Sequence, residues 1–352
     1  MRSLACITTT LVLLFALGCG SQDDSRAEYA YVSVPQAFLR DRVAAVYNKV
    51  ATVTSGQKLR ILDRSQNKRF VKVRTEAGAE GWLEQRYLVD QKVFDGFAKL
   101  ARDNGKDPAQ ATAIARRVVN LHLEPERPAE AIYQIKESGK VELLKRTSTP
   151  RSGLKKVKKD EAKESNNDDD DSDKTPANTP GDPLEDWWLV RDEQKHIGWA
   201  LGRMLDVEIP LEIAQYAEGQ RIVAAFVLNE VPETKESEKM IPQYAVLLTE
   251  PKDGLPFDYN QVRIFTWNAA RSRYETAYRE RLIGQLPFSV AKEDFGKDGI
   301  LPTFTLHAED KDGTLVIRKY RLIGPIVRRV TTPTEAAAAK GVKPEQRKPT
   351  QK

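Results

Sequence analysis

The stretch FVKVRTEAGAEGWLEQRYL, residues 70–88, recurs 117 residues later as WWLVRDEQKHIGWALGRML, residues 187–205. The two copies are identical at seven of their nineteen positions, which hold Val, Arg, Glu, Gly, Trp, Arg and Leu. Each copy has an alternating apolar run, a polar turn, and a second run that begins with Gly-Trp, which is the pattern of two paired strands. The repetition predicts a tandem of two small β domains.

The first copy lies inside a longer segment, residues 30–90, in which short alternating runs are separated by turn residues. This pattern is typical of a small barrel of about five strands. Leu39-Arg40 near its start and Gly81-Trp82 in its last strand resemble the bacterial SH3-like (SH3b) domain, with Phe70 in place of a more usual Trp. The resemblance implies a fold that recognises a ligand, without naming that ligand.

The second copy belongs to a segment, residues 120–206, that is interrupted. Its strand at residues 141–144 corresponds to residues 59–62 at an offset near 83, whereas its second half lies at 117, so the segment contains an insertion. Residues 148–183 hold a basic run, an acidic run and almost no large apolar side chain, which predicts a disordered excursion. The acidic run at 168–173 lacks the Gly and Glu spacing of an EF-hand loop, so no calcium site is expected there.

A helical spacer is expected between the two barrels, over residues 91–119. Asn104-Gly105 is a stop signal, and Asp107-Pro108 resembles the start of a second helix. The apolar residues on either side recur at helical spacing, and packing against the barrels is their expected role. These residues are Val93, Phe94, Phe97, Leu100 and Ala101 for the first helix, and Ala111, Ile114, Ala115, Val118 and Val119 for the second.

Residues 207–330 are predicted to form a third domain of about seven β-rich runs, among them 274–278 and 287–290. They predict an antiparallel β-sandwich or barrel-like fold, with propeller-like blades as the alternative. Asp312-Gly313, between two alternating runs, is the clearest hairpin signal in the chain. Residues 331–352 are rich in Pro, Ala, Lys and Gln and are expected to be a disordered tail. The fold class is therefore mainly β, with two small SH3-like barrels joined by a helical spacer and followed by this domain.

The beginning of the chain has the form of an export signal. Arg2 is followed by the short apolar stretch LVLLFAL at 11–17 and by Gly18-Cys19, and the stretch is too short to span a membrane. Residues 15–19 resemble the lipobox of bacterial lipoproteins, which implies a signal peptide at 1–18, a diacylated Cys19, and a polar tether at 19–29. The expected location is the cell envelope, anchored to the membrane through Cys19 and facing the periplasm or the extracellular side.

Composition argues against most catalytic sites. Only Cys6 and Cys19 are present, so once the signal is removed and Cys19 acylated, no thiol nucleophile remains, and no metal or cofactor is expected. The three histidines, His122, His196 and His307, show neither zinc-site spacing nor a GxSxG partner. A hydrolase with a carboxylate pair in the third domain stays open as an alternative, because such pairs are spatial.

Aromatic side chains are the candidate ligand-binding residues. An exposed aromatic ring can stack on a sugar ring or hold a peptide. Because the side chains of a strand alternate in direction, Trp187 and Trp188 are expected to point to opposite faces, one into the core. The candidate groove residues are Tyr47, Phe70, Trp82, Trp187, Trp188 and Trp199.

These features predict a non-enzymatic binding or scaffold protein of the cell envelope. The resemblance implies peptidoglycan or peptide ligands, and an accessory subunit that recruits a wall-remodelling enzyme is an alternative. A formal charge of +5 on 352 residues, diluted by 51 acidic residues, gives no support to a nucleic-acid partner. The expected partners are the membrane, through Cys19, and peptidoglycan or other envelope proteins.

Overall fold

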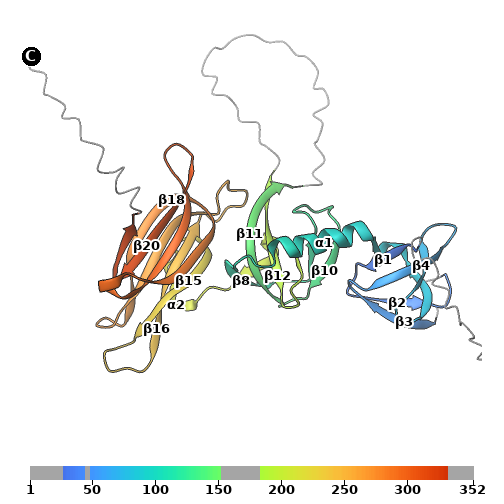
Figure 1. Cartoon of the computed structure of the whole chain (residues 1–352), viewed down its shortest axis with the longest axis horizontal. Coiled ribbons are helices and arrows are strands. Elements are labelled where there is room, and N and C mark those ends of the chain that lie inside the picture. Colours follow the sequence, from blue (N-terminus) through green and yellow to red (C-terminus); the bar gives the residue numbers. More distant parts are fainter. Residues whose placement is uncertain (1–26, 44–47, 152–182, 332–352) are drawn as a thin grey trace, which may run out of the picture.

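The computed structural model describes residues 27–43, 48–151 and 183–331, and these form three successive seven-stranded antiparallel sheets. Figure 1 shows the sheets side by side in chain order, with the first in blue, the second in green and the third in orange. The prediction of a mainly β chain is confirmed. In the described part of the chain, no helix is long and apolar enough to cross a membrane.

The first sheet, named the first barrel below, curls around a small core of its own. Its strand order is β3-β2-β6-β5-β4-β1-β7. Alternation along the short strands directs Leu39, Val71 and Val73 inward, where each is fully buried. Its elements are β1 (Tyr29–Val32), β2 (Gln36–Arg40), β3 (Lys49–Thr54), β4 (Lys58–Arg64), β5 (Phe70–Arg74), β6 (Glu80–Glu84), the 3-10 helix η2 (Gln85–Tyr87) and β7 (Leu88–Asp90).

The second sheet, named the second barrel, repeats this order as β10-β9-β13-β12-β11-β8-β14. The register repeats as well, because Arg40 pairs with Trp82 in the first sheet and His122 with Trp199 in the second. Both sheets have a register shift at the same point, next to Leu62 and next to Leu144. Its elements are β8 (Ala111–Ala115), β9 (Val119–His122), β10 (Ala131–Ile135), β11 (Lys140–Pro150), β12 (Leu184–Asp192), β13 (Ile197–Leu201), η3 (Gly202–Met204) and β14 (Leu205–Val207).

The glycine of each Gly-Trp pair has a packing reason. A Cβ at Gly81 would lie 2.8 Å from the Leu39 Cβ, and a Cβ at Gly198 would lie 2.7 Å from the Leu121 Cβ. Real Cβ atoms do not approach so closely, so β6 on β2 and β13 on β9 require glycine at these positions. The repeated Gly-Trp thus records a close strand contact that occurs in both sheets.

Only the first half of the predicted helical spacer is helical. Helix α1 (Gln91–Asn104) begins after Asp90, whose carboxylate accepts a hydrogen bond from the Val93 N–H. The predicted second helix is wrong, because β8 occupies its centre and β9 its end, and the second sheet therefore begins before residue 120. The alanines at 111, 113 and 115 fit the alternation of a strand as well as the spacing of a helix. This segment is a strand because it pairs with β11 and β14.

The predicted insertion lies between β11 and β12, at the position of the short β4–β5 turn of the first barrel. Residues 148–150 are not part of an excursion, because they continue β11, and Ser148 pairs with Asp186 of β12. Backbone pairing with β12 overrides their polar composition. Residues 152–182, like the predicted signal, Cys19, Tyr47 and the tail from residue 332, lie outside the described residues.

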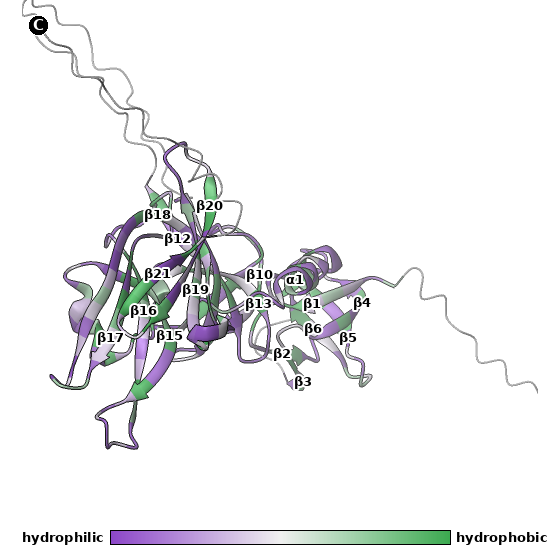
Figure 2. Cartoon of the chain, turned by 60° about the vertical axis from the view of Figure 1, so that its left-hand side comes forward, coloured by the Kyte–Doolittle hydropathy of each residue, from purple (hydrophilic) through white to green (hydrophobic). Residues whose placement is uncertain are grey.

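The third sheet is a single meander in which the seven strands pair in chain order. Hydrophobic and hydrophilic residues follow one another along its strands (Figure 2). The predicted runs at 274–278 and 287–290 are parts of one long strand, and the Asp312-Gly313 signal is a turn closed by the Gly313 N–H on the Asp310 carbonyl. Its elements are α2 (Leu211–Ala214), η4 (Gln215–Ala217), β15 (Arg221–Pro232), β16 (Met240–Thr249), β17 (Tyr259–Asn268), β18 (Arg273–Asp294), η5 (Gly296–Asp298), β19 (Ile300–Glu309), β20 (Leu315–Ile323) and β21 (Ile326–Val330).

The second barrel and the third sheet share one hydrophobic core, whereas the first barrel has a separate one. At their junction the Gln110 side chain accepts a buried hydrogen bond of 2.7 Å from the Phe288 N–H. The first barrel is joined to this unit through α1, where the rings of Tyr31 and Phe94 stack at 3.8 Å and Phe97 meets Tyr133 edge to face. The second barrel and the third sheet thus form one unit with a common core, and the first barrel is attached at one end.

Candidate functional site

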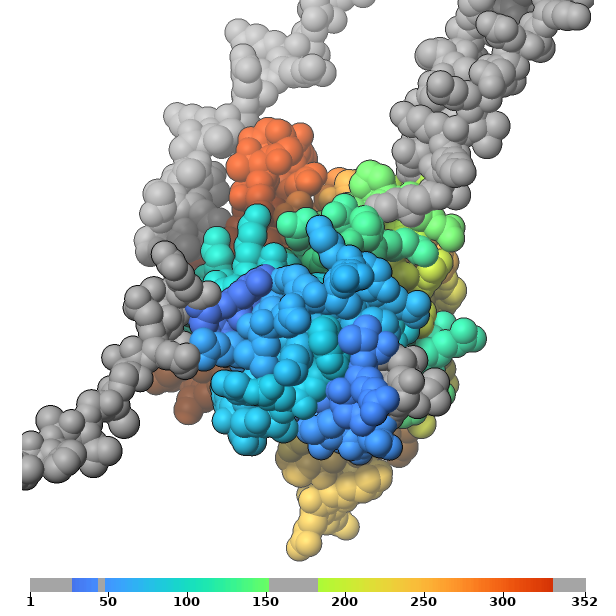
Figure 3. All heavy atoms as spheres, turned by 90° about the vertical axis from the view of Figure 1, so that its right-hand side faces the viewer, coloured from blue at the N-terminus to red at the C-terminus, as the bar shows by residue number. Residues whose placement is uncertain are grey.

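An open groove crosses the outer face of strands β2, β6 and β5 of the first barrel. Ala37 and Leu39 point into the core, so their neighbours Phe38 and Arg40 point outward, and Trp82 stands between two inward positions of β6. Figure 3 views the end of the molecule formed by this barrel. The groove has a volume of about 410 Å³ and is lined by Val34, Gln36, Ala37, Phe38, Arg40, Phe70, Trp82, Leu83, Glu84 and Tyr87.

Cations lie over the aromatic rings of the groove. The Lys49 Nζ is 4.5 Å from the centroid of the Phe38 ring, and the Arg69 guanidinium is 5.6 Å from that of Phe70. Such contacts are favourable because the face of an aromatic ring carries negative charge. The groove therefore combines an aromatic floor with a basic rim.

One acidic side chain lies in the groove, and its charge is offset. Glu84 forms an ion pair of 2.8 Å with Arg86, whose guanidinium also donates to the Tyr87 hydroxyl at 2.8 Å. Nearby on the same face, hydrogen bonds from Arg74 and Lys72 hold the pKa of Glu80 below its usual value. Each of these carboxylates therefore pairs with basic side chains of the same face, Glu84 with Arg86 and Glu80 with Arg74 and Lys72.

The structure brings two of the predicted aromatic residues, Phe70 and Trp82, into this groove. It adds Phe38 and Tyr87, which the sequence reasoning missed. The available signal for Phe38 was its alternation with Ala37 and Leu39, which leaves a large ring facing outward. The position of Tyr87 depends on η2, a short element with no sequence pattern of its own.

The predicted groove roles of Trp187 and Trp188 are wrong, because both side chains are buried, with exposed fractions of 2% and 8%. Trp188 packs into the core shared with the third sheet. Trp187 meets the His122 ring edge to face at 5.4 Å, and the segment after β9 is fastened beside it by an Arg127–Glu185 ion pair. Tertiary packing on both faces of β12 thus overrides the expectation that one tryptophan would be exposed.

Trp199 is also a packing residue. It lies with Leu189 and Ile197 against Leu100 and Ala101 of helix α1. By the shared strand register, the first barrel has Lys72 at the position of Leu189 and Glu80 at the position of Ile197. The face that forms the open groove in the first barrel is therefore apolar in the second barrel and covered by α1.

The three histidines do not form a common site. His122 and His307 contact backbone carbonyls of Ala129 and Pro287, and His196 contacts the Asp192 carboxylate at 2.9 Å while its ring stacks on Tyr133. Within residues 27–43, 48–151 and 183–331, no three His, Cys, Asp or Glu side chains lie close enough to hold a metal ion.

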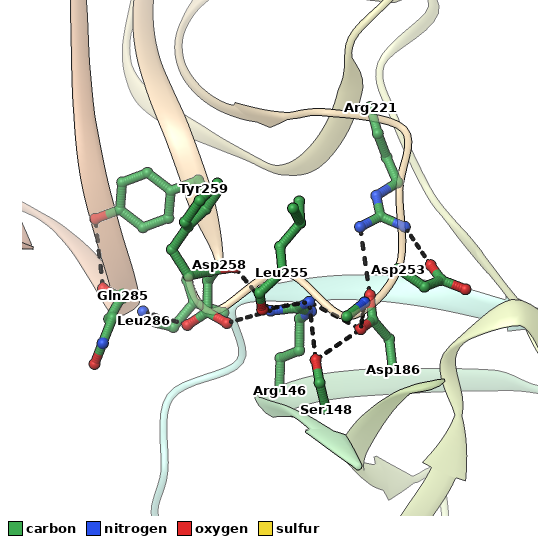
Figure 4. Close-up of polar contacts among 12 residues, drawn as sticks. Arg146, Ser148, Asp186, Arg221, Asp253, Leu255, Asp258, Tyr259, Gln285 and Leu286 are labelled. Atoms are coloured by element: carbon green, nitrogen blue, oxygen red, sulfur yellow. Dashed lines mark hydrogen bonds and ion pairs between the residues drawn. The ribbon is translucent and has the colours of Figure 1, made fainter. Parts of the chain in front are cut away.

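A second polar cluster lies at the junction of the second barrel and the third sheet (Figure 4). Arg146, 5% exposed, donates to Asp186 at 2.9 Å, to Asp258 at 3.2 Å and to the Phe257 carbonyl at 2.8 Å. The cluster lies beside a cavity of about 250 Å³. Because Arg146 and Asp186 belong to the second barrel and Asp258 precedes β17, this cluster ties the two together.

The two carboxylates of this cluster differ in pKa. Burial raises the pKa of Asp258 above its usual value, only partly opposed by the Leu286 N–H and Arg146. Burial acts in the same direction on Asp186, but the Gly254 N–H, Arg146 and Ser148 together hold its pKa below the usual value. The cluster thus holds one carboxylate whose pKa is lowered and one whose pKa is raised, both on the same buried arginine.

Comparison with known proteins gives one family match. Residues 36–89 match the model of the bacterial SH3 domain, which spans β2 to β7. The prediction of an SH3-like barrel in this part of the chain is confirmed. No curated protein matches the chain.

Solved structures resemble the chain only weakly. NlpC2 and NlpC1 from Trichomonas vaginalis are 10% and 9% identical, with a TM-score of 0.17 each, and cover 83% and 86% of this chain and 91% and 92% of their own. An NlpC/P60 family protein from Bacillus cereus ATCC 10987 is 8% identical, with a TM-score of 0.22, over 82% of this chain and 93% of its own. At such TM-scores these structures carry no argument about this chain.

Proposed function

We propose that this protein is a non-enzymatic binding protein of the cell envelope, and that its first barrel binds peptidoglycan or its peptide part. The observation that carries the proposal is the open groove with Phe38, Phe70 and Trp82 on a domain that matches the bacterial SH3 family. Aromatic rings of this kind offer apolar area to sugar rings and peptides, while their edges stay in contact with water. In this proposal binding resides in the first barrel alone.

The second barrel is, in this proposal, a second SH3-like copy that has become a scaffold. Its strand order, its register and its Gly198 repeat those of the first barrel, which supports the assignment. Its equivalent face packs against α1, and its core continues into the third sheet. A copy that is covered in this way holds the first barrel in place rather than binding a ligand.

The proposal predicts that Trp82→Ala weakens wall binding by about 30-fold, since the loss of a central aromatic contact costs about 2 kcal/mol. The measurement is co-sedimentation of the purified protein with purified peptidoglycan over a range of concentrations. Ile317→Ala removes a comparable exposed apolar side chain, 63% exposed, from the third sheet and should leave binding unchanged. If Trp82→Ala and the parent protein sedimented equally, the groove would not be the site of wall binding.

The anchor at Cys19 is part of the same proposal and rests on the sequence alone. Expressed in bacteria with a labelled fatty acid, the protein should incorporate label, and Cys19→Ala should incorporate none, because the thiol that forms the thioether is absent. Cys6→Ala is the matched control and should label normally. Label that persists in Cys19→Ala would contradict lipidation at this residue.

A further inference from the structure

The positive charge of the chain is concentrated in the first barrel. Residues 27–90 contain eleven Lys and Arg against seven Asp and Glu, a net charge of +4, whereas the whole chain of 352 residues carries +5. A compact basic domain attracts anionic ligands over distances of about a Debye length. The domain that carries the groove is therefore also the domain that favours an anion.

Two of these cations lie beside the groove, over aromatic rings that line it, and have no carboxylate partner among the described residues. Lys49 lies over the Phe38 ring and Arg69 over the Phe70 ring. Arg86, by contrast, is already paired with Glu84. Lys49 and Arg69 are thus held in position by ring contacts while their charges stay available to a ligand.

The strand order places these two cations on opposite sides of the groove. Phe38 belongs to β2 and Phe70 to β5, and β6 lies between them. Because neighbouring strands are about 4.8 Å apart, the backbones of β2 and β5 lie about 10 Å from each other. An extended peptide advances about 3.3 Å per residue, so two carboxylates must be at least about three residues apart to reach from one side of the groove to the other.

The second barrel has neither cation at the equivalent positions. By the shared register, Ala131 stands where the first barrel has Lys49, and Asp186 stands where it has Arg69. The two charges are therefore not a requirement of this barrel fold. They accompany the open groove only.

We propose that the groove of the first barrel selects a peptide with two carboxylate groups, which accept hydrogen bonds from Lys49 and Arg69 while its apolar parts lie on Trp82. The inference rests on the proposed function and names the part of the wall polymer that is bound, the acidic peptide rather than the sugar strand. Hydrogen bonds between two ionised groups are about twice as strong as neutral ones. A neutral sugar would leave both charges unused, and the carboxylate of Glu84 in the groove disfavours a continuous polyphosphate.

The test compares purified peptidoglycan sacculi in two forms, native and with their peptide carboxylates converted to amides. The full-length protein should bind native sacculi and should bind the amidated form about tenfold more weakly. The double variant Lys49→Gln/Arg69→Gln should lose about tenfold in affinity for native sacculi and show little further loss on amidation. Lys58→Gln/Arg60→Gln removes the same charge from β4, away from the groove residues, and should stay within about twofold of the parent protein.

Each other result counts against the inference in a distinguishable way. Equal binding to native and amidated sacculi would overturn carboxylate selection and leave wall binding intact. Binding to neither form would overturn the proposed function as well. Tighter binding to phosphatidylglycerol vesicles than to sacculi, lost in Lys49→Gln/Arg69→Gln, would assign the two cations to a membrane surface instead.

Discussion

Arg146→Met is expected to destabilise the unit formed by the second barrel and the third sheet by about 3–5 kcal/mol. The variant leaves Asp186 and Asp258 at the junction without the guanidinium that lies between them, and an uncompensated buried charge has a cost of this size. Urea unfolding followed by tryptophan fluorescence measures the effect. Four of the five tryptophans, at 187, 188, 199 and 267, lie in this unit and report on it.

The pH dependence gives this prediction a second readout. The pKa of Asp186 is depressed in the folded protein, so its stabilising contribution is present above the unfolded pKa and is lost as the pH falls through the folded pKa. In Arg146→Met, the same fall in pH protonates the carboxylates that have lost their partner. Protonation removes the uncompensated buried charge that destabilises the variant. The difference in unfolding free energy between parent and variant should therefore be smaller at acidic pH than at neutral pH.

Arg271→Met is the matched control. Arg271 is 63% exposed and pairs with Glu275, and exposed pairs of this kind contribute about 0–1 kcal/mol. If Arg146→Met lowered the unfolding free energy no more than Arg271→Met does, the junction cluster would not hold the two sheets together.

Trp187→Ala is expected to cost about 3–5 kcal/mol of unfolding free energy and to leave wall binding unchanged while the protein is folded. Trp187 is 2% exposed, and its removal would leave a large cavity between β12 and its neighbours. Thermal unfolding followed by circular dichroism measures the loss, since the substitution removes a fluorescent probe. The prediction separates the packing role found for this tryptophan from the ligand role that its sequence position had suggested.

Phe38→Ala should behave in the opposite way. Phe38 is 38% exposed, so its truncation should change stability by only about 0.5 kcal/mol while it weakens wall binding. If Trp187→Ala abolished wall binding while the variant stayed as stable as the parent protein, the second barrel would also take part in recognition.

The two barrels share a strand framework and differ on their outer faces by a small number of substitutions. Gly81 and Gly198 preserve the same close strand contact. On the outer face, Lys72 and Glu80 of the first barrel correspond to Leu189 and Ile197 of the second. The polar pair keeps the first face open to water, and the apolar pair gives α1 a surface on which to pack.

The sequence by itself determined the local pattern of this protein. Alternation and turn residues predicted the strands, the Asp312-Gly313 turn and the first barrel, and the repeated Gly-Trp marked the close strand contact. These features are local because strand alternation and turn geometry depend on residues near in the chain. They named Phe70 and Trp82 as candidates, but nothing local separated these two from Trp187, Trp188 and Trp199, which are packed.

The tertiary structure decided which faces are covered. Whether Trp187 or Trp199 is exposed depends on the segment after β9 and on α1, and the alternating alanines of β8 become a strand only by pairing with β11 and β14. Arg146 and Asp258 are 112 positions apart, and no local pattern connects them. Burial is a property of what packs on a residue from elsewhere in the chain, which is why the open groove could be located only once the three sheets were placed in space.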